Sequence, residues 1–193
     1  MGQTMPATEA MTAGEFLARP ITEDSRFESL VEGEVVMTDP NLMHGALQGR
    51  IFVALTSWIA QGAQRGSVHL PADNLLDEHN VYKPDILWYS EPRKPDLRSP
   101  RPYPMPDIGA EVRSPSTWRF DIGAKKRGYE RHELPELWLV DTEAAAIVVF
   151  RRSRAGTPEF DVALELAAGD QLESPQLGGF SLDLEELFFF FKD

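Results

Sequence analysis

Two acidic residues and one lysine between positions 83 and 141 have the types and spacing that hydrolysis at a metal ion requires. Asp85 begins the run DILWYS, Glu111 lies in the run IGAEVR, and Lys125 follows in a segment of helical composition. Carboxylates on neighbouring strands of one sheet project side by side, so the two acids can meet if these runs pair. Mg²⁺ and Mn²⁺ take oxygen ligands, and Mg²⁺ often takes only one or two protein carboxylates. A nearby lysine can orient the attacking water and offset the charge of a phosphate.

Ordinary structural roles account for the same residue types. A carboxylate beside a strand is most often a solvated edge residue or the partner of a helix cap. Lys125 follows Asp121 by four residues, which is the spacing of an exposed ion pair on a helix. His44, at the start of a long helical pattern, can contact a water or phosphate near a metal, or can bond to backbone or solvent. Residue types and spacing therefore leave catalysis as one of two interpretations.

Turn signals and periodicity predict the elements of the N-terminal half. Residues 26–38 alternate loosely around a break at Glu32 and Gly33, which indicates a β-hairpin with a tight turn. After an N-cap signal at Asn41, apolar residues recur at helical spacing as far as Ile59. This stretch is therefore predicted to form the longest helix of the chain.

The rest of the chain predicts strands on either side of a second helix. The runs GSVHLP, DILWYS and IGAEVR are strand-like and precede a helical segment at 120–132. The runs LWLVD, AAAIVVFRR and PEFDVALEL follow that segment and predict three more strands. Residues 73–82 are expected to form an irregular or weakly stranded link, and the proline-rich segment 91–106 a surface loop that is longer than usual.

Length and composition fit one globular domain. The 193 residues are 42% hydrophobic and contain no cysteine, which excludes a disulfide framework, a thiolate zinc site and a cysteine nucleophile. We expect residues 1–11 to be a disordered start and residues 12–193 to form a single domain. No apolar run approaches the length of about 20 residues that spans a bilayer, and no secretory signal is visible. We therefore expect a cytoplasmic protein without a membrane segment.

The net charge of −12 argues against a general affinity for nucleic acid, because non-specific binders are usually basic. A local basic patch can still bind phosphates. Basic residues near the two carboxylates supply a candidate patch that consists of Arg113, Arg119, Lys125, Lys126, Arg127 and Arg131. We expect any contact with DNA to use this patch.

Several motifs occur together from about residue 26 to the C-terminus. The set consists of LVEGEVV at 30–36, His44, Pro84-Asp85, Glu111-Val112, Ser114-Pro115-Ser116-Thr117, Asp121, Lys125, Tyr129 and PELWLVD at 135–141. Together these motifs resemble the Uma-two family of restriction-endonuclease-like proteins, a domain of unknown function placed in the PD-(D/E)XK nuclease superfamily. The combination is specific, whereas any single motif in it is not.

The resemblance implies a restriction-endonuclease-like α/β (α+β) fold, with a mixed β-sheet core flanked by helices and an N-terminal β-hairpin. The core order is helix, three strands, helix, strand. The resemblance further implies that Asp85 and Glu111 bind Mg²⁺ or Mn²⁺ and that Lys125 completes the catalytic set. The superfamily usually has its lysine two residues after the second acid, where this chain has Arg113, which cannot act as a base at neutral pH. The lysine maps instead onto the helix, at Lys125, with Lys126 as the second choice.

Glu34 and His44 are the supporting residues that the resemblance implies. Family members usually have a continuous acidic segment, Y-E-L-I-D-G-E, before the long helix. Here Ser29 separates Glu28 from Leu30, so the match is imperfect and Glu34 is preferred to Glu28.

Three functions are consistent with these observations. The first is a metal-dependent endonuclease that hydrolyses phosphodiester bonds of DNA. The second is a catalytically inactive module of the same fold that acts in interaction or regulation, and the third is a small-nucleotide phosphoesterase. The resemblance makes a homodimer plausible for the first, because two sites related by symmetry suit cleavage of both strands of a duplex.

Overall fold

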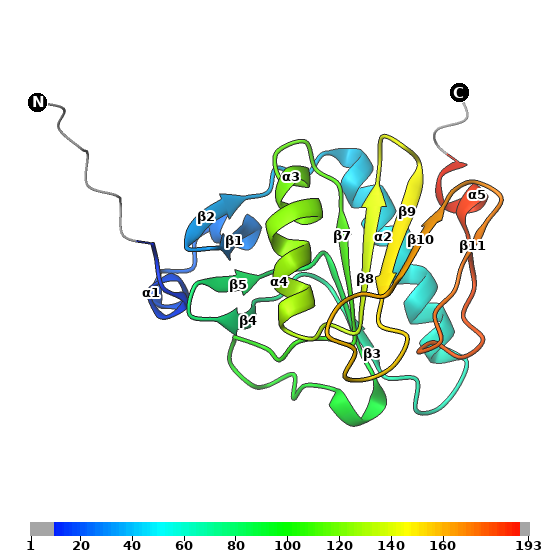
Figure 1. Ribbon diagram of the computed structural model, residues 1–193, viewed down its shortest axis with the longest axis horizontal. Helices are drawn as coiled ribbons and strands as arrows, with labels where there is room; N and C mark the ends of the chain where they lie inside the picture. Colours follow the sequence, from blue (N-terminus) through cyan, green and yellow to red (C-terminus); the bar gives the residue numbers. More distant parts are fainter. Residues whose placement is uncertain (1–9, 190–193) are drawn as a thin grey trace, which may run out of the picture.

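A computed structural model describes residues 10–189 of the chain (Figure 1). The disordered start predicted for residues 1–11 lies outside the described residues, apart from its last two positions. The Met11 N–H donates to the Gly33 carbonyl at 3.0 Å. No helix in the described part of the chain has the length and apolar character that crossing a bilayer requires.

The elements of the N-terminal half are α1 (Ala13–Ala18), η1 (Asp24–Phe27), β1 (Glu28–Val31), β2 (Glu34–Met37), α2 (Leu42–Ala60), β3 (Ser67–His69), β4 (Asn74–Asp77), β5 (Asn80–Tyr82), β6 (Ile86–Tyr89) and η2 (Glu91–Arg93). The elements of the C-terminal half are β7 (Ile108–Val112), α3 (Trp118–Phe120), η3 (Asp121–Lys125), α4 (Lys126–Arg131), β8 (Glu136–Asp141), β9 (Ala146–Arg151), β10 (Val162–Leu166), β11 (Gln171–Leu172), β12 (Leu182–Asp183) and α5 (Leu184–Leu187). η1 and η2 are short 3₁₀ helices, whereas η3 is π-helical.

Six strands form the central sheet, in the order β10-β9-β8-β7-β6-β3. β7 and β8 run parallel, and the other neighbours run antiparallel. The helical segment from α3 to α4 joins the parallel pair, because parallel strands need a crossover connection. Along the chain, α2 precedes β3, β6 and β7, and α4 precedes β8. This is the expected order of helix, three strands, helix and strand, so the predicted mixed-sheet fold is confirmed.

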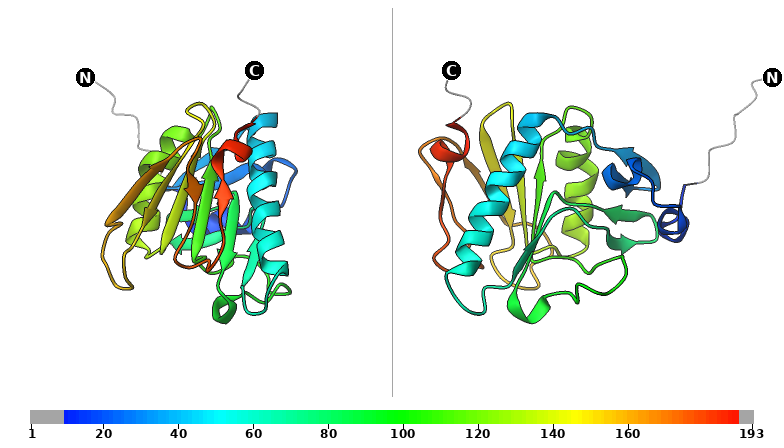
Figure 2. Two further views of the ribbon diagram at one scale, coloured as in Figure 1. Left: turned by 90° about the vertical axis from the view of Figure 1, so that its right-hand side faces the viewer. Right: turned by 180° about the vertical axis from the view of Figure 1, so that it is seen from behind.

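Helices cover both faces of this sheet, with α2 on one side and α4 on the other (Figure 2). Trp138 and Val140 of β8 join the core that contains α2 and α5. Leu137 and Leu139 of the same strand join the core that contains α4. Side chains alternate between faces along a strand, and both neighbours of Glu111 belong to the α2 core. Glu111 therefore points toward α4.

α2 forms where the apolar periodicity predicts it. The Asn41 side chain caps the helix by accepting the His44 N–H at 2.9 Å. Leu47, Ile51 and Leu55 then recur at four-residue spacing and are fully buried against the sheet. Burial of each such side chain stabilises the fold by about 1.5–3 kcal/mol, which anchors the start of α2 beside the strand ends.

A smaller sheet has the order β2-β1-β5-β4. The predicted β1–β2 hairpin is confirmed, and its turn places Glu32 and Gly33 at φ values of 51° and 79°. Gly33 adopts this left-handed conformation without the steric cost of a Cβ atom. Residues 73–82, for which the sequence indicated an irregular or weakly stranded link, form β4 and β5. β5 pairs with β1, a contact between distant segments that the local pattern of 73–82 does not encode.

α4 approaches this smaller sheet closely at Gly128. A Cβ atom at this position would lie 2.2 Å from the Tyr82 hydroxyl oxygen, so a larger residue would push α4 away from β5. The Tyr82 ring also meets the Tyr129 ring edge-on, with centroids 5.0 Å apart. These contacts fix the rotation of α4 about its axis and direct Tyr129 toward the central sheet.

Candidate active site

Asp85 and Glu111 lie opposite each other at one end of the β6–β7 pair. Ile86 pairs with Ala110, so the antiparallel register, continued by one residue, sets Asp85 across from Glu111. The Val112 N–H donates to Asp85 Oδ2 at 2.7 Å, which holds this carboxylate against β7. Strand pairing therefore brings together the two acids that the sequence analysis selected.

Lys125 is buried between two carboxylates rather than exposed on its helix. Its Nζ lies 3.2 Å from Glu111 Oε2 and 2.9 Å from Asp121 Oδ1. No side chain of the three is more than 3% exposed. The ion pair expected from the four-residue spacing exists, but its expected exposure is wrong, because this side of the helical segment packs against β7.

The segment that carries Asp121 and Lys125 is itself unusual. These two residues begin and end the π-helical segment η3, between α3 and α4. Short π-helical segments inside α-helices are rare and occur frequently at functional sites. Here the segment places a carboxyl group and an ammonium group on the side of the helix that faces Glu111.

Tyr129 completes the surroundings of Glu111. Its hydroxyl donates to Glu111 Oε1 at 2.6 Å, while Lys125 contacts the other carboxylate oxygen. Residue types and spacing assigned no catalytic or supporting function to Asp121 or Tyr129. The signal for both was present, because residues 121, 125 and 129 recur every four positions and so lie on one side of a helix.

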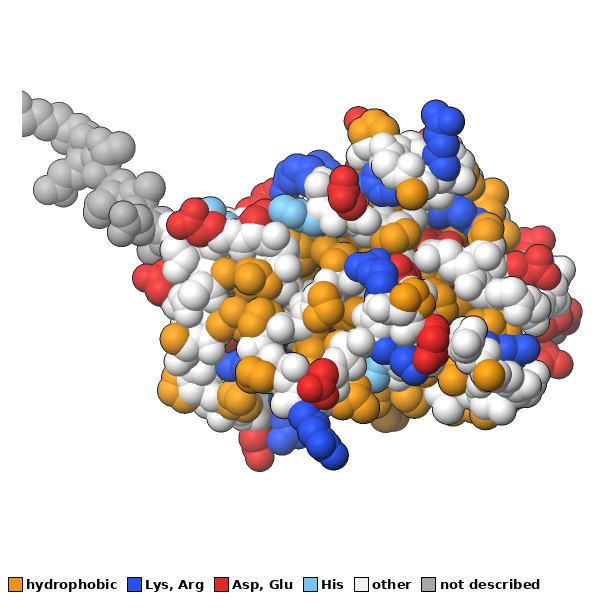
Figure 3. Space-filling model, turned by 90° about the horizontal axis from the view of Figure 1, so that it is seen from below, with side chains coloured by type: hydrophobic (Ala, Val, Ile, Leu, Met, Phe, Trp, Pro, Cys, Tyr) orange, Lys and Arg blue, Asp and Glu red, His pale blue; other side chains and the backbone are white. Residues whose placement is uncertain are grey.

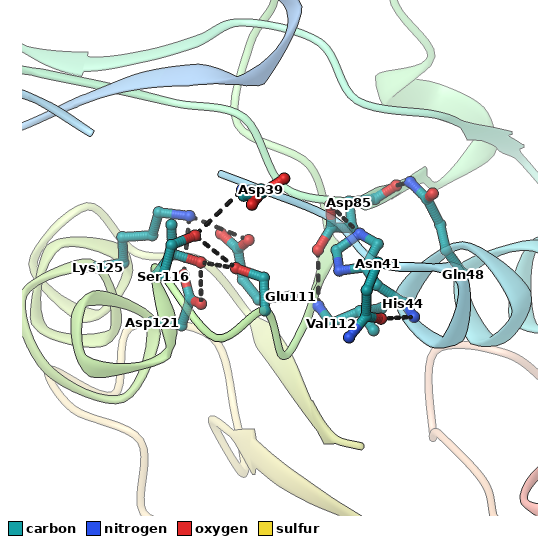
Figure 4. Close-up of polar contacts among 12 residues, drawn as sticks. Asp39, Asn41, His44, Gln48, Asp85, Glu111, Val112, Ser116, Asp121 and Lys125 are labelled. Carbon is teal, nitrogen blue, oxygen red and sulfur yellow. Dashed lines mark hydrogen bonds and ion pairs between the residues drawn. The ribbon is translucent and has the colours of Figure 1, made fainter. Parts of the chain in front are cut away.

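Two residues of α2 hold Asp85 from the other side (Figure 4). His44 Nε2 lies 3.2 Å from Asp85 Oδ1, and Gln48 Nε2 donates to the Asp85 carbonyl at 2.9 Å. Burial lowers the pKa of His44, but its hydrogen bond to Asp85 and the charge of that carboxylate raise the pKa above the ordinary value. The structure thus brings His44 to the predicted acid.

The loop after β7 links this cluster to the segment before α2. Ser114 Oγ lies 2.8 Å from Thr117 Oγ1, and Thr117 donates to Asp121 Oδ2 at 3.1 Å. Ser116 Oγ accepts the Asp39 N–H at 3.1 Å. The SPST motif therefore holds Asp121 on one side and the entry to α2 on the other.

The buried cluster carries more negative than positive groups. Asp85, Glu111 and Asp121 face the ammonium of Lys125 and the imidazole of His44. Burial raises the pKa of Glu111 to about 8, because the charge of Lys125 offsets only part of the desolvation penalty. Burial also raises the pKa of Asp121. Burial lowers the pKa of Lys125, but the charges of Asp121 and Glu111 raise it well above its ordinary value, so the ammonium stays protonated.

The raised pKa of Glu111 predicts how the stability of the metal-free protein depends on pH. The carboxyl group ionises near pH 4.5 in the unfolded chain, but only at about pH 8 in the folded protein. Stability is therefore lost as the pH rises between these two values. In EDTA, we expect the melting temperature of the wild type to fall over this range and that of Glu111→Gln to fall less. Parallel melting curves for the two proteins would contradict this assignment.

The oxygen donors of Asp85 and Glu111 fit a divalent ion such as Mg²⁺ or Mn²⁺. Each carboxylate oxygen has more than one acceptor position, so the contacts described above leave some of them open. A cation would also lower the raised pKa of Glu111, because a nearby positive charge favours the ionised carboxylate. Within residues 10–189, no group of three or more His, Asp or Glu side chains is arranged to hold a metal unaided. An ion that keeps several waters, such as Mg²⁺, needs only one or two protein carboxylates.

Comparisons with known proteins agree with this architecture. The sequence profile of the Uma2 family, described as "Putative restriction endonuclease", matches residues 13–185. The chain belongs to the Uma2 family. It is also similar to the crystal structure of a "putative nuclease belonging to DUF820" from Anabaena variabilis, with a TM-score of 0.76. The two are 19% identical, and the match covers 93% of this chain and 98% of that chain, which shows a shared fold. No curated protein matches the sequence significantly.

In this Uma2 chain, Arg113 occupies the position at which the superfamily usually has its lysine. Its Nη1 lies 2.9 Å from Asp141 Oδ1, and its Nη2 lies 2.7 Å from Glu143 Oε2. The guanidinium also lies over the Trp118 ring, 5.4 Å from its centroid. Arg113 is therefore engaged beside β8, and Lys125 supplies the buried cation next to Glu111.

Two other candidates lie away from the cluster of this Uma2 chain. Lys126 Nζ is 3.5 Å from Glu130 Oε2 and 4.6 Å from the centroid of the Phe150 ring, so it faces the other side of α4. Glu34 is exposed at the turn end of β2, opposite Val31. The structure thus brings Lys125, and neither Lys126 nor Glu34, into contact with Glu111.

Three basic residues of the expected DNA-binding patch lie against carboxylates in this Uma2 chain. Arg113 and Lys125 bind the carboxylates named above, and Arg127 Nη2 lies 3.7 Å from Glu32 Oε1. Seen from below, Lys and Arg side chains are scattered among acidic and hydrophobic ones (Figure 3). Carboxylates therefore offset part of the charge of these three residues, and contact of the patch with DNA stays a prediction.

Proposed function

We propose that this Uma2 protein is a metal-dependent endonuclease that hydrolyses phosphodiester bonds of DNA. The observation that carries the proposal is the buried cluster in which Asp85 and Glu111 lie opposite each other and Lys125 contacts Glu111. A buried charge destabilises the fold unless an opposite charge balances it. Three carboxyl groups beside one lysine are therefore not explained by stability alone. Strongly shifted pKa values of this kind gather at functional sites, where a metal or substrate supplies the missing charge. The family description supports the same reaction class.

Each residue of the cluster has a separate role in the proposed reaction. Asp85 and Glu111 would hold Mg²⁺ or Mn²⁺, which when bound polarises a water and offsets charge on the phosphate. Lys125 stays protonated, so it donates hydrogen bonds and positive charge rather than acting as a base. His44 and the Val112 N–H hold the Asp85 carboxylate in a fixed orientation.

Nicking of supercoiled plasmid at low salt tests this proposal. The wild type is expected to nick with Mn²⁺ or Mg²⁺ and to lose the activity in EDTA. Mn²⁺ binding, followed by electron paramagnetic resonance, is a second readout. Nicking that survives in Asp85→Asn would reveal a contaminating nuclease. If Mn²⁺ binding depends on Asp85 but no plasmid is nicked, the metal site is supported and DNA is not the substrate.

Tyr129→Phe tests whether the hydroxyl of Tyr129 positions Glu111. The substitution keeps the ring and removes one hydrogen bond from the carboxylate, which also raises the pKa of Glu111 further because this bond lowers it. Loss of a hydrogen-bond partner of a metal ligand typically costs about 10- to 100-fold in metal affinity or activity. We expect a loss of this size in nicking rate and in Mn²⁺ affinity.

Tyr82→Phe is the matched control. The Tyr82 hydroxyl is also buried, but it donates to Asn80 Oδ1 rather than to Glu111. We expect this variant to keep the Mn²⁺ affinity of the wild type. Equal losses in Tyr129→Phe and Tyr82→Phe would mean that both act only through the stability of the core.

A further inference from the structure

The proposed active site opens into a large cleft. The cleft has a volume of about 1330 Å³, which exceeds the roughly 300–1,000 Å³ of sites for drug-sized ligands. Asp85 and His44 line it, whereas Glu111 and Lys125 are buried. Its other walls come from η1, the first turns of α2, residues 70–73 and residues 99–103 of the long loop. The space is therefore sufficient for more than a single small molecule.

Much of the cleft wall is apolar and accessible. Phe27 of η1 is 46% exposed, and Leu42 at the start of α2 is 95% exposed. Both residues line the cleft, together with Leu70, Pro71 and Tyr103. Aromatic rings are platforms on which unpaired nucleic-acid bases stack, whatever their sequence, and apolar neighbours widen such a platform. The paired bases of a duplex have their faces covered by one another and cannot use such a wall.

A few basic residues line the same cleft. Lys83 Nζ and Arg101 Nη1 contact the two carboxylate oxygens of Asp73, at 3.2 Å and 2.8 Å, so this group keeps one net positive charge. Arg26 lines the cleft and is exposed. The cleft therefore offers positive charge for a small number of phosphates.

A duplex would require a different surface. Duplex binding is dominated by phosphate neutralisation, and a protein that makes about 6–10 phosphate contacts is typical. This chain has a net charge of −12, and the Lys and Arg residues that line the cleft are Arg26, Lys83 and Arg101. The cleft beside Asp85 thus combines stacking surface with modest positive charge, which suits a single strand.

We infer that the substrate enters this cleft as an unpaired strand of nucleic acid. Bases lie against Phe27 and Leu42, and the backbone passes Arg26 and Lys83 toward Asp85. This inference rests on the proposed nuclease function and names the form of its substrate. Single strands, and duplexes with a single-stranded segment such as a fork, are bound and cut in preference to fully paired DNA.

Fluorescence anisotropy measures this preference directly. Wild-type protein in Ca²⁺ is titrated into a short labelled oligothymidine and into a hairpin duplex with the same number of phosphates, and the single strand is expected to bind more tightly. Phe27→Ala is expected to weaken strand binding by about 5- to 150-fold. Leu42→Ala is expected to weaken it less, because leucine has no ring on which a base can stack. Leu164→Ala, at an exposed leucine of β10 outside the cleft, is expected to bind as the wild type does. Arg26→Gln is expected to reduce the slope of log affinity against log salt by about 0.7.

Three results would overturn the inference. These are equal or tighter binding of the duplex, strand binding that Phe27→Ala leaves unchanged, and competition by thymidine monophosphate as effective as that by the strand. Hydrolysis is scored separately on forked and fully paired DNA. If forked and fully paired DNA are cleaved equally and Asp85→Asn abolishes this cleavage, the preference for an unpaired strand is wrong and the nuclease function stands. If strand binding depends on Phe27 but no DNA is cleaved, the cleft binds single strands and the proposed nuclease function is wrong.

Discussion

Asp85→Asn is expected to lower metal-dependent DNA cleavage by about 10³-fold or more. Asparagine keeps an oxygen that can accept the Val112 N–H, but it removes the charge that a divalent ion requires. A metal ion stabilises the transition state of such reactions by several kcal/mol. A loss of about 4 kcal/mol corresponds to roughly 10³-fold in rate. Initial rates of plasmid nicking, measured over a range of Mn²⁺ concentrations, check the prediction.

Glu111→Gln and Glu34→Gln provide a matched pair of acidic substitutions. Glu111→Gln is expected to lose as much activity as Asp85→Asn, because Glu111 lies opposite Asp85 in the register of β6 and β7. Glu34→Gln is expected to nick at the wild-type rate, because Glu34 is exposed on β2. A large loss in Glu34→Gln would contradict this arrangement and extend the site to the hairpin. Wild-type nicking by Glu111→Gln would place the metal elsewhere.

Lys125→Met is expected to destabilise the protein and to abolish most of its activity. Methionine fills a similar volume, but it leaves Glu111 and Asp121 without their shared cation. Removal of one partner from a buried ion pair costs about 3–5 kcal/mol. Loss of the positioned ammonium is expected to slow cleavage by about 10²- to 10³-fold. Guanidinium unfolding at two pH values and nicking rates measure the two effects.

The pH dependence of this destabilisation follows from the two carboxylates. Burial raises the pKa of both Glu111 and Asp121, and without Lys125 they are ionised still less readily. Both groups can take up protons at low pH, so the destabilisation of Lys125→Met should be smaller at pH 5 than at pH 8. A destabilisation that is equal at the two pH values would contradict the buried charge cluster.

Lys126→Met and a double variant complete this experiment. Lys126 faces Glu130 and Phe150, so its replacement is expected to change stability by less than about 1 kcal/mol and to leave nicking intact. Adding Asp121→Asn to Lys125→Met should recover part of the lost stability but none of the activity. Similar losses of stability and nicking rate in Lys125→Met and Lys126→Met would contradict a specific role for Lys125.

Most of the fold could be predicted because its signals act over a few neighbouring residues. Glu32 and Gly33 form the predicted turn since glycine tolerates a left-handed conformation. Asn41 caps α2 with its own side chain, and the apolar run of β6 is buried on both faces as a continuous run predicts. β4 and β5 were not predicted as regular strands because β5 depends on pairing with the distant β1.

The choice between the two adjacent lysines could not be made from spacing alone. Successive residues of an α-helix point about 100° apart, so Lys125 and Lys126 belong to different sides of the same helical segment. Resemblance to the family favoured Lys125, and packing shows why. The contact of Gly128 with Tyr82 fixes the rotation of α4, which turns Lys125 toward Glu111.

By itself, the sequence determined the hairpin, the long capped helix and most of the strand-forming runs, and it singled out the two acids Asp85 and Glu111. The order of the core elements came from the resemblance to the family. Only the tertiary structure decided that Asp121 and Lys125 are buried, that Tyr129 holds Glu111, that Glu34 stays on the surface and that a cleft leads to Asp85. The physical reason is the range of the interactions. Turns, caps and periodicity depend on adjacent residues, whereas burial and charge pairing depend on segments that meet only when the chain has folded.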